Sequence, residues 1–434
     1  MNAGREGRKF RVIIVIPEIP GFAGDLRMDA ATGTRVIMDY QYKSILRGKH
    51  SIFGQIEAQG VDPKNHIFVF NLRSYDRLNV TQALKAQEEK SGIPYHELQR
   101  AEADEIMAPD DDGNEAREAA ADKKRRFEDQ REDIGLGDEG GTIDPDSIAD
   151  DAMLNDKKVS EEKWDGDPEK EKENFFQEEL YVHAKVCIVD DKTVICGSSN
   201  INDRVSAKNP LYLQAPACVY RKQGWSALTP LQSQLGYHDS ELSIVMTDTR
   251  ALDSTMDGAP YRAGHHAATL RRVLWREHLG LLPAQSLDAS KDPNAQPPGD
   301  SPNDNLEGPE FDFVADPLSD ALWDLWCRRA STNTDVFRDL FHADPDDCIR
   351  SFGDYDAFTP NPKADKQYKQ GHLYDMNRPV AEVRRELDRI QGHLVWMPLR
   401  FLEDAEMAEK GLQVNAYTES IYTWVKRFWG CEAL

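Results

Sequence analysis

The residues best suited to chemistry lie in one segment, residues 181–204, which reads YVHAKVCIVDDKTVICGSSNINDR. In it, His183, Lys185 and Asp190 form the pattern HxK(x)4D, and GSxN follows after six further residues. Residues two apart on a strand point the same way, so His183 and Lys185 are expected to project from one face. An imidazole can attack phosphorus or protonate a leaving oxygen, while an ammonium group neutralises phosphoryl oxygens. The pair is therefore typical of phosphate chemistry.

The turn at Gly197–Asn200 extends this prediction. Its backbone N–H groups, the Ser198 hydroxyl and the Asn200 amide can donate hydrogen bonds to the same phosphate. The alternative is a structural histidine, but only His183 among the 11 histidines has a lysine two residues later. The full pattern has a chance expectation far below about 1 in 1,000 for this length, which favours a functional site. For Asp190, a turn-forming role and a direct catalytic role are equal alternatives.

The elements around this segment alternate between strands and helices. Strands are expected at Leu180–Val189 and Thr193–Cys196, around a turn at Asp190–Lys192, and at Glu241–Met246. Further strands are expected at residues 11–16 and 66–70, and helices at 32–48, 266–279, 317–330 and 381–392. This alternation predicts an α/β fold.

The formal net charge of −24 is concentrated in one region. Residues 101–180 hold 29 Asp and Glu against 11 Lys and Arg, so the other 354 residues carry a net charge of only −6. An acidic balance argues against generic nucleic-acid binding, which depends on basic surface. Because aromatic and β-branched periodicity is almost absent, residues 105–172 are predicted to be a largely disordered insertion with a transient helix at 114–133. Residues 286–311, rich in Pro, Asp, Ser and Asn, are expected to form a loop.

The cysteines and the first strand bear on the cellular compartment. Six cysteines are scattered without CxxC pairs, which is typical of reduced thiols in an intracellular protein and predicts no zinc site. The apolar run from Val12 to Ile16 is too short for a membrane span and suits a buried strand. No metal or cofactor is predicted.

The HxK(x)4D segment resembles the HKD signature of the phospholipase D superfamily. More narrowly, the chain resembles the C-terminal half of eukaryotic, fungal-type, phosphatidylcholine-hydrolysing phospholipase D. Further landmarks carry the resemblance: VIIVIPEIPGFAGDL at 12–26, NLRSYDR at 71–77, YHDSELSIVMTDT at 237–249, RVLWREHLGLL at 272–282 and LVWMPLRFLED at 394–404. The resemblance implies a phospholipase D-like mixed β-sheet flanked by helices and interrupted by the acidic insertion.

The resemblance also implies roles for single residues. His183 is the nucleophile or the acid of a two-histidine pair, Lys185 and Asn200 bind the phosphoryl group, and Ser198 lines the pocket. Glu241 corresponds to the acidic residue that orients the histidine. A carboxylate partner fixes the imidazole tautomer and stabilises imidazolium, although a solvent-facing strand position is the alternative for Glu241.

Two departures from the family pattern stand out. The family uses two HKD motifs that meet across a pseudo-twofold cleft, but this sequence contains one. We expect a C-terminal part of a longer enzyme, with little turnover alone, or a homodimer that supplies the second histidine. The second departure is Val205–Gln232, 28 residues between INDR and SQLGYHDSE, which we interpret as a retained intron or else a surface loop.

The expected domain organisation follows these boundaries. Residues 1–104 form an α/β segment before the motif, 105–172 the acidic insertion, 173–285 the HKD-containing segment, 286–311 a loop and 312–434 the C-terminal region. The resemblance implies hydrolysis of phosphatidylcholine to phosphatidic acid and choline through a phosphohistidine, by a cytoplasmic, peripherally membrane-associated protein that acts on phospholipid and not on nucleic acid. The alternatives are a nuclease or other phosphodiesterase of the superfamily, and a non-catalytic fragment that acts by interaction.

Overall fold

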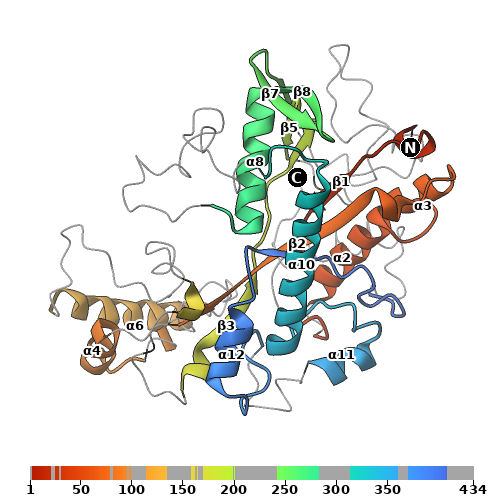
Figure 1. Ribbon diagram of the computed structural model, residues 1–434. Helices are drawn as coiled ribbons and strands as arrows, with labels where there is room; N and C mark the ends of the chain where they lie inside the picture. The colour runs from red at the N-terminus through yellow and green to blue at the C-terminus, as the bar shows by residue number, and fades with distance from the viewer. Residues whose placement is uncertain are drawn as a thin grey trace, which may run out of the picture. The chain divides into compact units, whose positions relative to one another are not determined.

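The computed structural model describes residues 2–20, 25–28, 31–78, 82–94, 97–98, 114–133, 158–161, 164, 170–198, 200, 242–282, 313–359 and 370–407 (Figure 1). The chain divides into two compact units. The first comprises Met1–Ser74, Gln177–Tyr374 and Arg389–Leu434, and the second comprises Tyr75–Phe176 and Asp375–Asp388. The fold is mixed α/β, as the sequence predicts.

Most residues of a four-stranded sheet belong to the first unit. Its strands are β1 (Val12–Val15), β2 (Ile67–Arg77), β3 (Phe175–Glu179) and β9 (Leu394–Trp396). The short apolar strand β1 pairs in parallel with the start of β2, and β9 pairs antiparallel with the middle of β2. The predicted strands at 11–16 and 66–70 are confirmed, but β2 continues to Arg77 because β3 and β9 also pair with it.

Alternate residues of β2 enter two different cores. Ile67 and Val69 pack with α2 (Thr32–Ile45), while Phe70 and Leu72 pack with α10 (Asp320–Phe341). Successive side chains of a strand point to opposite faces, so the two helices cover opposite faces of the sheet. Short helices complete this unit: α1 (Asn2–Arg5), α3 (Ile52–Glu57), the 3-10 helix η2 (Pro63–Asn65) and α11 (Phe352–Phe358).

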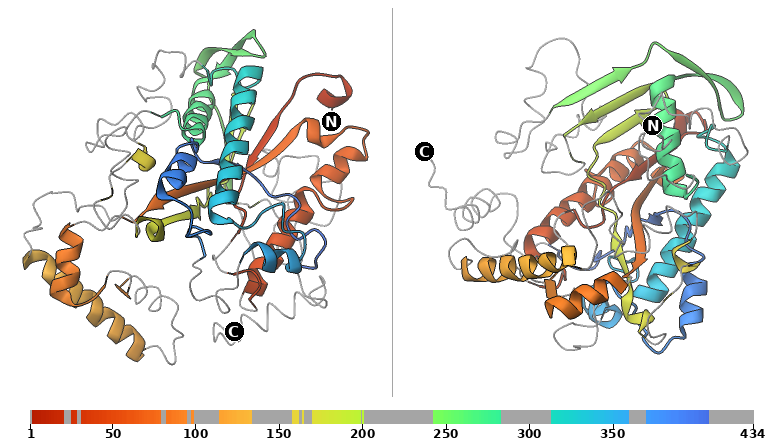
Figure 2. Two further views of the ribbon diagram at one scale, coloured as in Figure 1. Left: turned by 60° about the horizontal axis from the view of Figure 1, so that its bottom comes forward. Right: turned by 90° about the vertical axis from the view of Figure 1, so that its left-hand side faces the viewer.

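A smaller antiparallel sheet carries the motif. It consists of β4 (Val186–Val189), β5 (Thr193–Gly197) and β6 (Ser243–Thr247), with β5 in the centre. The hairpin of β7 (Ala251–Met256) and β8 (Ala259–Gly264) follows, and then α8 (His265–Leu279), which ends at Gly280 in the left-handed conformation, φ 64°. These elements run from yellow-green to green in Figure 2. The helix expected at 266–279 is confirmed.

Four sequence-based boundaries were wrong. The helix expected at 32–48 ends at Ile45. The strand expected at Leu180–Val189 is regular only from Val186, because the hydrogen bonds of residues 181–184 are not those of a ladder. The helix expected at 317–330 covers Asp320–Phe341 instead, since the buried amide of Asn333 donates to the carbonyls of Gln391 and Leu394 and so accommodates a polar run inside the helix. The helix expected at 381–392 ends at Leu387, ahead of a turn at Gly392 with φ 65°.

The second unit contains part of the acidic region. The helix α6 (Asn114–Asp133) covers the predicted 114–133 and buries Phe127 with Ile93 and Leu98, beside α4 (Gln82–Ser91). This unit also has the 3-10 helices η3 (Val159–Glu161) and η4 (Glu171–Asn174), and α12 (Val380–Leu387). Glu171, at the end of the predicted disordered insertion, is instead buried and ion-paired with Arg77 and Arg384.

Several sequence-based expectations lie outside the described residues. These are most of the remainder of 105–172, the loop at 286–311, the 28-residue segment 205–232 and Glu241. Within the described ranges, no helix combines the length and apolar character needed to cross a membrane.

Candidate active site

His183 is exposed on an extended stretch that leads into β4. Its ring lies 6.0 Å from that of Tyr181, centroid to centroid. The Lys185 ammonium donates to the carbonyl oxygen of His183 at 2.6 Å, and the Lys185 carbonyl accepts from the Gly197 N–H at 3.0 Å. The two motif residues are therefore neighbours with their main chain tied to β5. A phosphoryl oxygen could replace the His183 carbonyl as the partner of the ammonium group.

The GSxN turn lies where β5 meets β6. The Leu242 N–H donates to the Ser198 hydroxyl at 3.0 Å, and the Ser198 N–H donates to the Leu242 carbonyl at 3.1 Å. A Cβ atom on Gly197 would collide with Ser243 Oγ and lie 2.9 Å from the Leu242 carbonyl oxygen, so only glycine permits this close approach. Ser198 and Asn200 are exposed, and the turn brings Ser198 to the same end of β5 that bonds Lys185.

The two aspartates of the β4–β5 turn have different surroundings. Asp190 is exposed with φ 51°, and its carbonyl accepts from the Tyr261 hydroxyl at 2.8 Å. Asp191 is buried, and both of its carboxylate oxygens accept from Arg271 on α8, at 2.6 and 2.8 Å. The geometry of Asp190 fits its turn-forming alternative. Sequence reasoning missed Asp191, although the Asp-Asp doublet marked the position.

Arg271 links the β4–β5 turn, through Asp191, to further parts of the first unit. Its guanidinium group also donates to the carbonyls of Val314 and Ala315 and lies 4.6 Å from the centre of the Trp275 ring. The motif turn is thereby fixed to α8 and to the segment that precedes α10. A bidentate arginine–carboxylate pair of this kind gives both energy and a defined geometry.

The predicted partner of the histidine, Glu241, belongs to the part of the chain that is not described. The structure therefore brings together His183, Lys185, Gly197 and Ser198, and leaves the contact between His183 and Glu241 a prediction. In the described ranges, no group of three or more His, Cys, Asp or Glu side chains is arranged to hold a metal ion.

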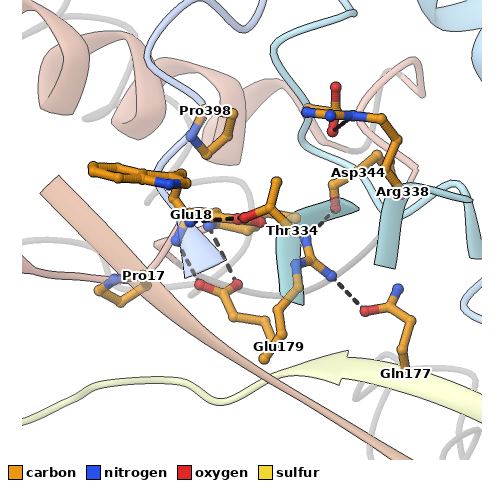
Figure 3. Close-up of polar contacts among 12 residues, drawn as sticks. Pro17, Glu18, Gln177, Glu179, Thr334, Arg338, Asp344 and Pro398 are labelled. Carbon is orange, nitrogen blue, oxygen red and sulfur yellow. Dashed lines mark hydrogen bonds and ion pairs between the residues drawn. The ribbon is translucent and has the colours of Figure 1, made fainter. Parts of the chain in front are cut away.

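A buried charge cluster precedes the motif by four residues (Figure 3). Arg73 on β2 forms an ion pair with Glu18 and donates to Gln177 Oε1 at 2.5 Å and to the Asp344 carbonyl at 2.8 Å. Glu179, at the end of β3, accepts from the backbone N–H of Glu18 at 2.5 Å and of Ile19 at 3.3 Å. These contacts hold the end of β1 against the strand that leads to His183.

The cluster contains more acid than base. Burial raises the pKa of Glu18 to about 8; the neighbouring Arg73 opposes this rise, and Glu179 adds to it. Burial likewise raises the pKa of the Glu179 carboxyl. Two carboxylates therefore share one guanidinium group, and a proton on one of them balances the charge. Sequence reasoning missed this cluster, whose signals were an acidic residue directly after an apolar strand and another just before the motif.

Apolar side chains are exposed around the motif. They lie before β4, on β4, and on and just before β6, with exposed fractions from 37% to 74%: Tyr181, Val186, Val189, Leu242, Ile244, Val245 and Met246. A cluster of large exposed apolar side chains marks an interaction surface more often than does a single one. The residues suited to chemistry therefore sit in a surface that the described residues do not cover.

Comparisons with known proteins found curated relatives that match nearly the whole chain. No family model matches the chain. Phospholipase D zeta 1 of Arabidopsis thaliana is 25% identical over 416 residues, which cover 93% of this chain and 25% of that protein. Phospholipase D1 of Homo sapiens is 24% identical over 409 residues, covering 94% and 24%, and phospholipase D2 of Bos taurus 24% identical over 406 residues, covering 93% and 27%. The chain spans about a quarter of the length of these curated relatives.

The fold is mixed α/β, and the HxK(x)4D–GSxN segment has the pattern of the HKD signature. The similarity to curated phospholipases over nearly the whole chain assigns it to the phospholipase D family.

Proposed function

We propose that the chain forms part of a phospholipase D that hydrolyses phosphatidylcholine to phosphatidic acid and choline. The observation that carries the proposal is the exposed His183 next to Lys185, at the strand end where Gly197 and Ser198 form the GSxN turn. A histidine with an adjacent ammonium group is suited to nucleophilic attack on a phosphodiester. The names of the relatives support the lipid substrate over a nucleic acid.

In the proposed reaction, an imidazole nitrogen of His183 bonds to phosphorus and the bond from phosphorus to the choline oxygen breaks. The choline oxygen takes a proton from a second acid as it leaves. Water then attacks the phosphohistidine, which releases phosphatidic acid and regenerates the histidine. A primary alcohol in place of water gives a phosphatidyl alcohol. Lys185, Ser198 and Asn200 bind the phosphoryl oxygens, and Glu241 orients the imidazole.

The second acid must come from outside this motif, because the sequence holds one HxK(x)4D. We propose that another polypeptide segment supplies it, either the N-terminal half of a longer enzyme or a second copy of this chain. The exposed apolar residues around the motif support a partner at this surface, since such residues are normally covered. The site would act at the surface of a membrane, on the cytoplasmic side.

Transphosphatidylation tests the proposal. The full chain, alone and mixed with the N-terminal half of a phospholipase D relative, is incubated with phosphatidylcholine vesicles and a primary alcohol. We expect phosphatidyl alcohol in the mixture and an acid-labile phosphoenzyme on this chain, both lost in His183→Ala. His50→Ala is the matched control, because His50 is also exposed but lies far from the motif in sequence.

The outcomes separate the parts of the proposal. Activity of the chain alone, with a dimer in solution, supports the second copy as the source of the other histidine. Turnover that survives His183→Ala would overturn the site. Cleavage of DNA in place of lipid would overturn the substrate class, while absence of both product and phosphoenzyme in every mixture would refute the catalytic role.

A further inference from the structure

The first unit contains a cavity of about 280 Å³ whose walls come from separate parts of the chain. The described residues around it belong to the segment after β1, to β2, to α10, to the loop after α10, and to β9 and the segment after it. Its volume is at the lower end of the range for small-molecule sites, which suits a ligand of a few heavy atoms. The cavity is separate from His183 and the GSxN turn, none of which line it.

The cavity wall has more negative than positive groups. Four carboxyl side chains line it, from Glu18, Asp335, Asp346 and Asp347, against the two guanidinium groups of Arg73 and Arg338. Both cations are already engaged: Arg73 pairs with Glu18, and Arg338 pairs with Asp346 at 2.8 Å and with Asp335 at 3.3 Å. An anion entering the cavity would therefore meet excess negative charge and no uncommitted cation among these lining residues.

Asp347 is the lining carboxylate that has the least compensation. Among the described residues the backbone N–H of Arg400 donates to it at 2.8 Å, and the guanidinium groups of Arg338 and Arg400 act on it through space without forming an ion pair. Burial raises the pKa of this half-buried carboxyl. A cationic ligand would supply the missing charge, as a cation lowers the free energy of a partly desolvated carboxylate.

Aromatic groups complete the wall. Phe337 and Trp396 line the cavity with these carboxylates. The Trp396 indole is fixed by Phe70, 4.5 Å away between ring centroids, and by a hydrogen bond from its N–H to the Ser331 hydroxyl at 3.0 Å. A tryptophan ring beside carboxylates is the combination that binds organic cations, because the ring face attracts positive charge and the alkyl groups pack on it.

We propose that this cavity binds a small alkylammonium ion through Asp347 and the Trp396 ring. The inference goes beyond the proposed phospholipase activity and does not depend on it. Free alkylammonium and the headgroup of a lipid share this chemistry. The structure favours the free ion for two reasons. The phosphate of a lipid headgroup would be repelled by the carboxylates of the cavity, and the glycerol with its acyl chains would not fit into a cavity of this size.

Calorimetric titration of the full chain with choline chloride tests the proposal, with sodium chloride at equal ionic strength in the reference. We expect saturable binding of choline and none of 3,3-dimethylbutanol, which has the same shape without the charge. Trp396→Leu should weaken binding by about 2- to 30-fold, and Asp347→Asn by about tenfold or more. Glu57→Gln, which removes an exposed charge that does not line the cavity, should leave the affinity unchanged.

Two controls separate this site from the catalytic motif and from loss of folding. His183→Ala should bind choline as the wild type does, so loss of phospholipase activity and loss of this site are distinguishable. Thermal unfolding of each variant shows that it is folded before titration. Equal binding of choline and its neutral isostere, equal binding by Asp347→Asn, or binding only to phosphatidylcholine vesicles and not to free choline would overturn the proposal.

Discussion

Glu18 and Arg73 of the charge cluster are buried, whereas His183 of the motif is exposed, although Glu179 of the cluster lies only four positions before His183. The side chains of Glu18 and Arg73 are 2% and 5% exposed, and their partners are all within the first unit. His183 is exposed, and on neighbouring β6 Ile244 is 60% exposed. The buried and paired charges of the cluster hold the segment after β1 against β3, while His183 and Lys185 remain accessible to a ligand or a partner.

The contrast shows which part of the fold is complete. The cluster joins β1, β2 and β3 and needs nothing further from outside, apart from the proton that balances Glu18 and Glu179. The motif sheet exposes apolar side chains that normally lie in a core or an interface. The following predictions test this contrast between enclosed and open regions.

The largest effect is expected for Arg73→Met. The change leaves Glu18 and Glu179 buried without their shared cation, which costs about 3–5 kcal/mol in the free energy of unfolding. Urea denaturation measures this cost. The control is Arg262→Met, which breaks the exposed pair with Asp253 and should cost about 0–1 kcal/mol. Similar losses in the two variants would contradict the special role of the cluster.

Gly197→Ala should have the next largest effect, at the open region. The added Cβ would collide with Ser243 Oγ and the Leu242 carbonyl, so we expect a loss of about 1–3 kcal/mol and faster amide exchange in β5 and β6. Gly33→Ala is the matched control: no atom lies within 4 Å of its Cβ position on α2, so alanine should stabilise that helix. Thermal unfolding and hydrogen exchange provide the measurements. An unchanged exchange rate in β5 would refute the steric argument.

A third prediction concerns the pH dependence of stability. The pKa of Glu18 is raised from 4.5 to about 8, so the folded state binds its proton more tightly than the unfolded state. That stabilisation is complete below about pH 4.5 and is lost as the pH rises towards 8. Glu18→Gln does not titrate, so its stability should increase relative to the wild type between pH 5 and 8.

Denaturation curves at several pH values test this change in slope. The half-buried His278 and His393, whose pKa values are lowered by desolvation, titrate in both proteins and cancel in the difference. Parallel stability profiles for the two proteins would show that Glu18 is already ionised in the folded state.

The smallest effect on stability is expected for Ile244→Thr. This side chain is 60% exposed, so the free energy of unfolding should change by no more than about 0.5 kcal/mol, while binding of an apolar dye falls. Val194→Thr, at a residue 1% exposed on the adjacent strand, should instead cost about 1–3 kcal/mol. If Ile244→Thr destabilised the chain as much as Val194→Thr, the β6 residue would belong to a core.

Local sequence patterns predicted the elements whose partners are nearby or uniformly apolar. The apolar run at 11–16 and the helices expected at 32–48 and 266–279 were recognised in this way, and the structure forms β1, α2 and α8 there. Their apolar periodicity records the burial of one face, which is a local property of the sequence.

The rest depended on contacts between distant residues. Glu18, Arg73 and Glu179 form one cluster although up to 161 positions separate them, and nothing local marks them as partners. The buried Asn333 was equally hidden, since its partners are the carbonyls of residues 391 and 394. For the candidate site, the pattern identified His183 and Lys185, but the preference of strands for β-branched residues overstated how far β4 reaches towards them.

Cys187 and Cys196 lie on the small sheet of β4, β5 and β6, one on each face, and their thiols can be used to label the two faces separately. Cys187 pairs with Ile195 across β4 and β5, whereas Cys196 pairs with Val186, so their side chains point to opposite faces. Both cysteines are exposed. A maleimide reagent would therefore mark both faces of the isolated chain, and the cysteine that becomes protected in a complex would identify the face that the partner covers.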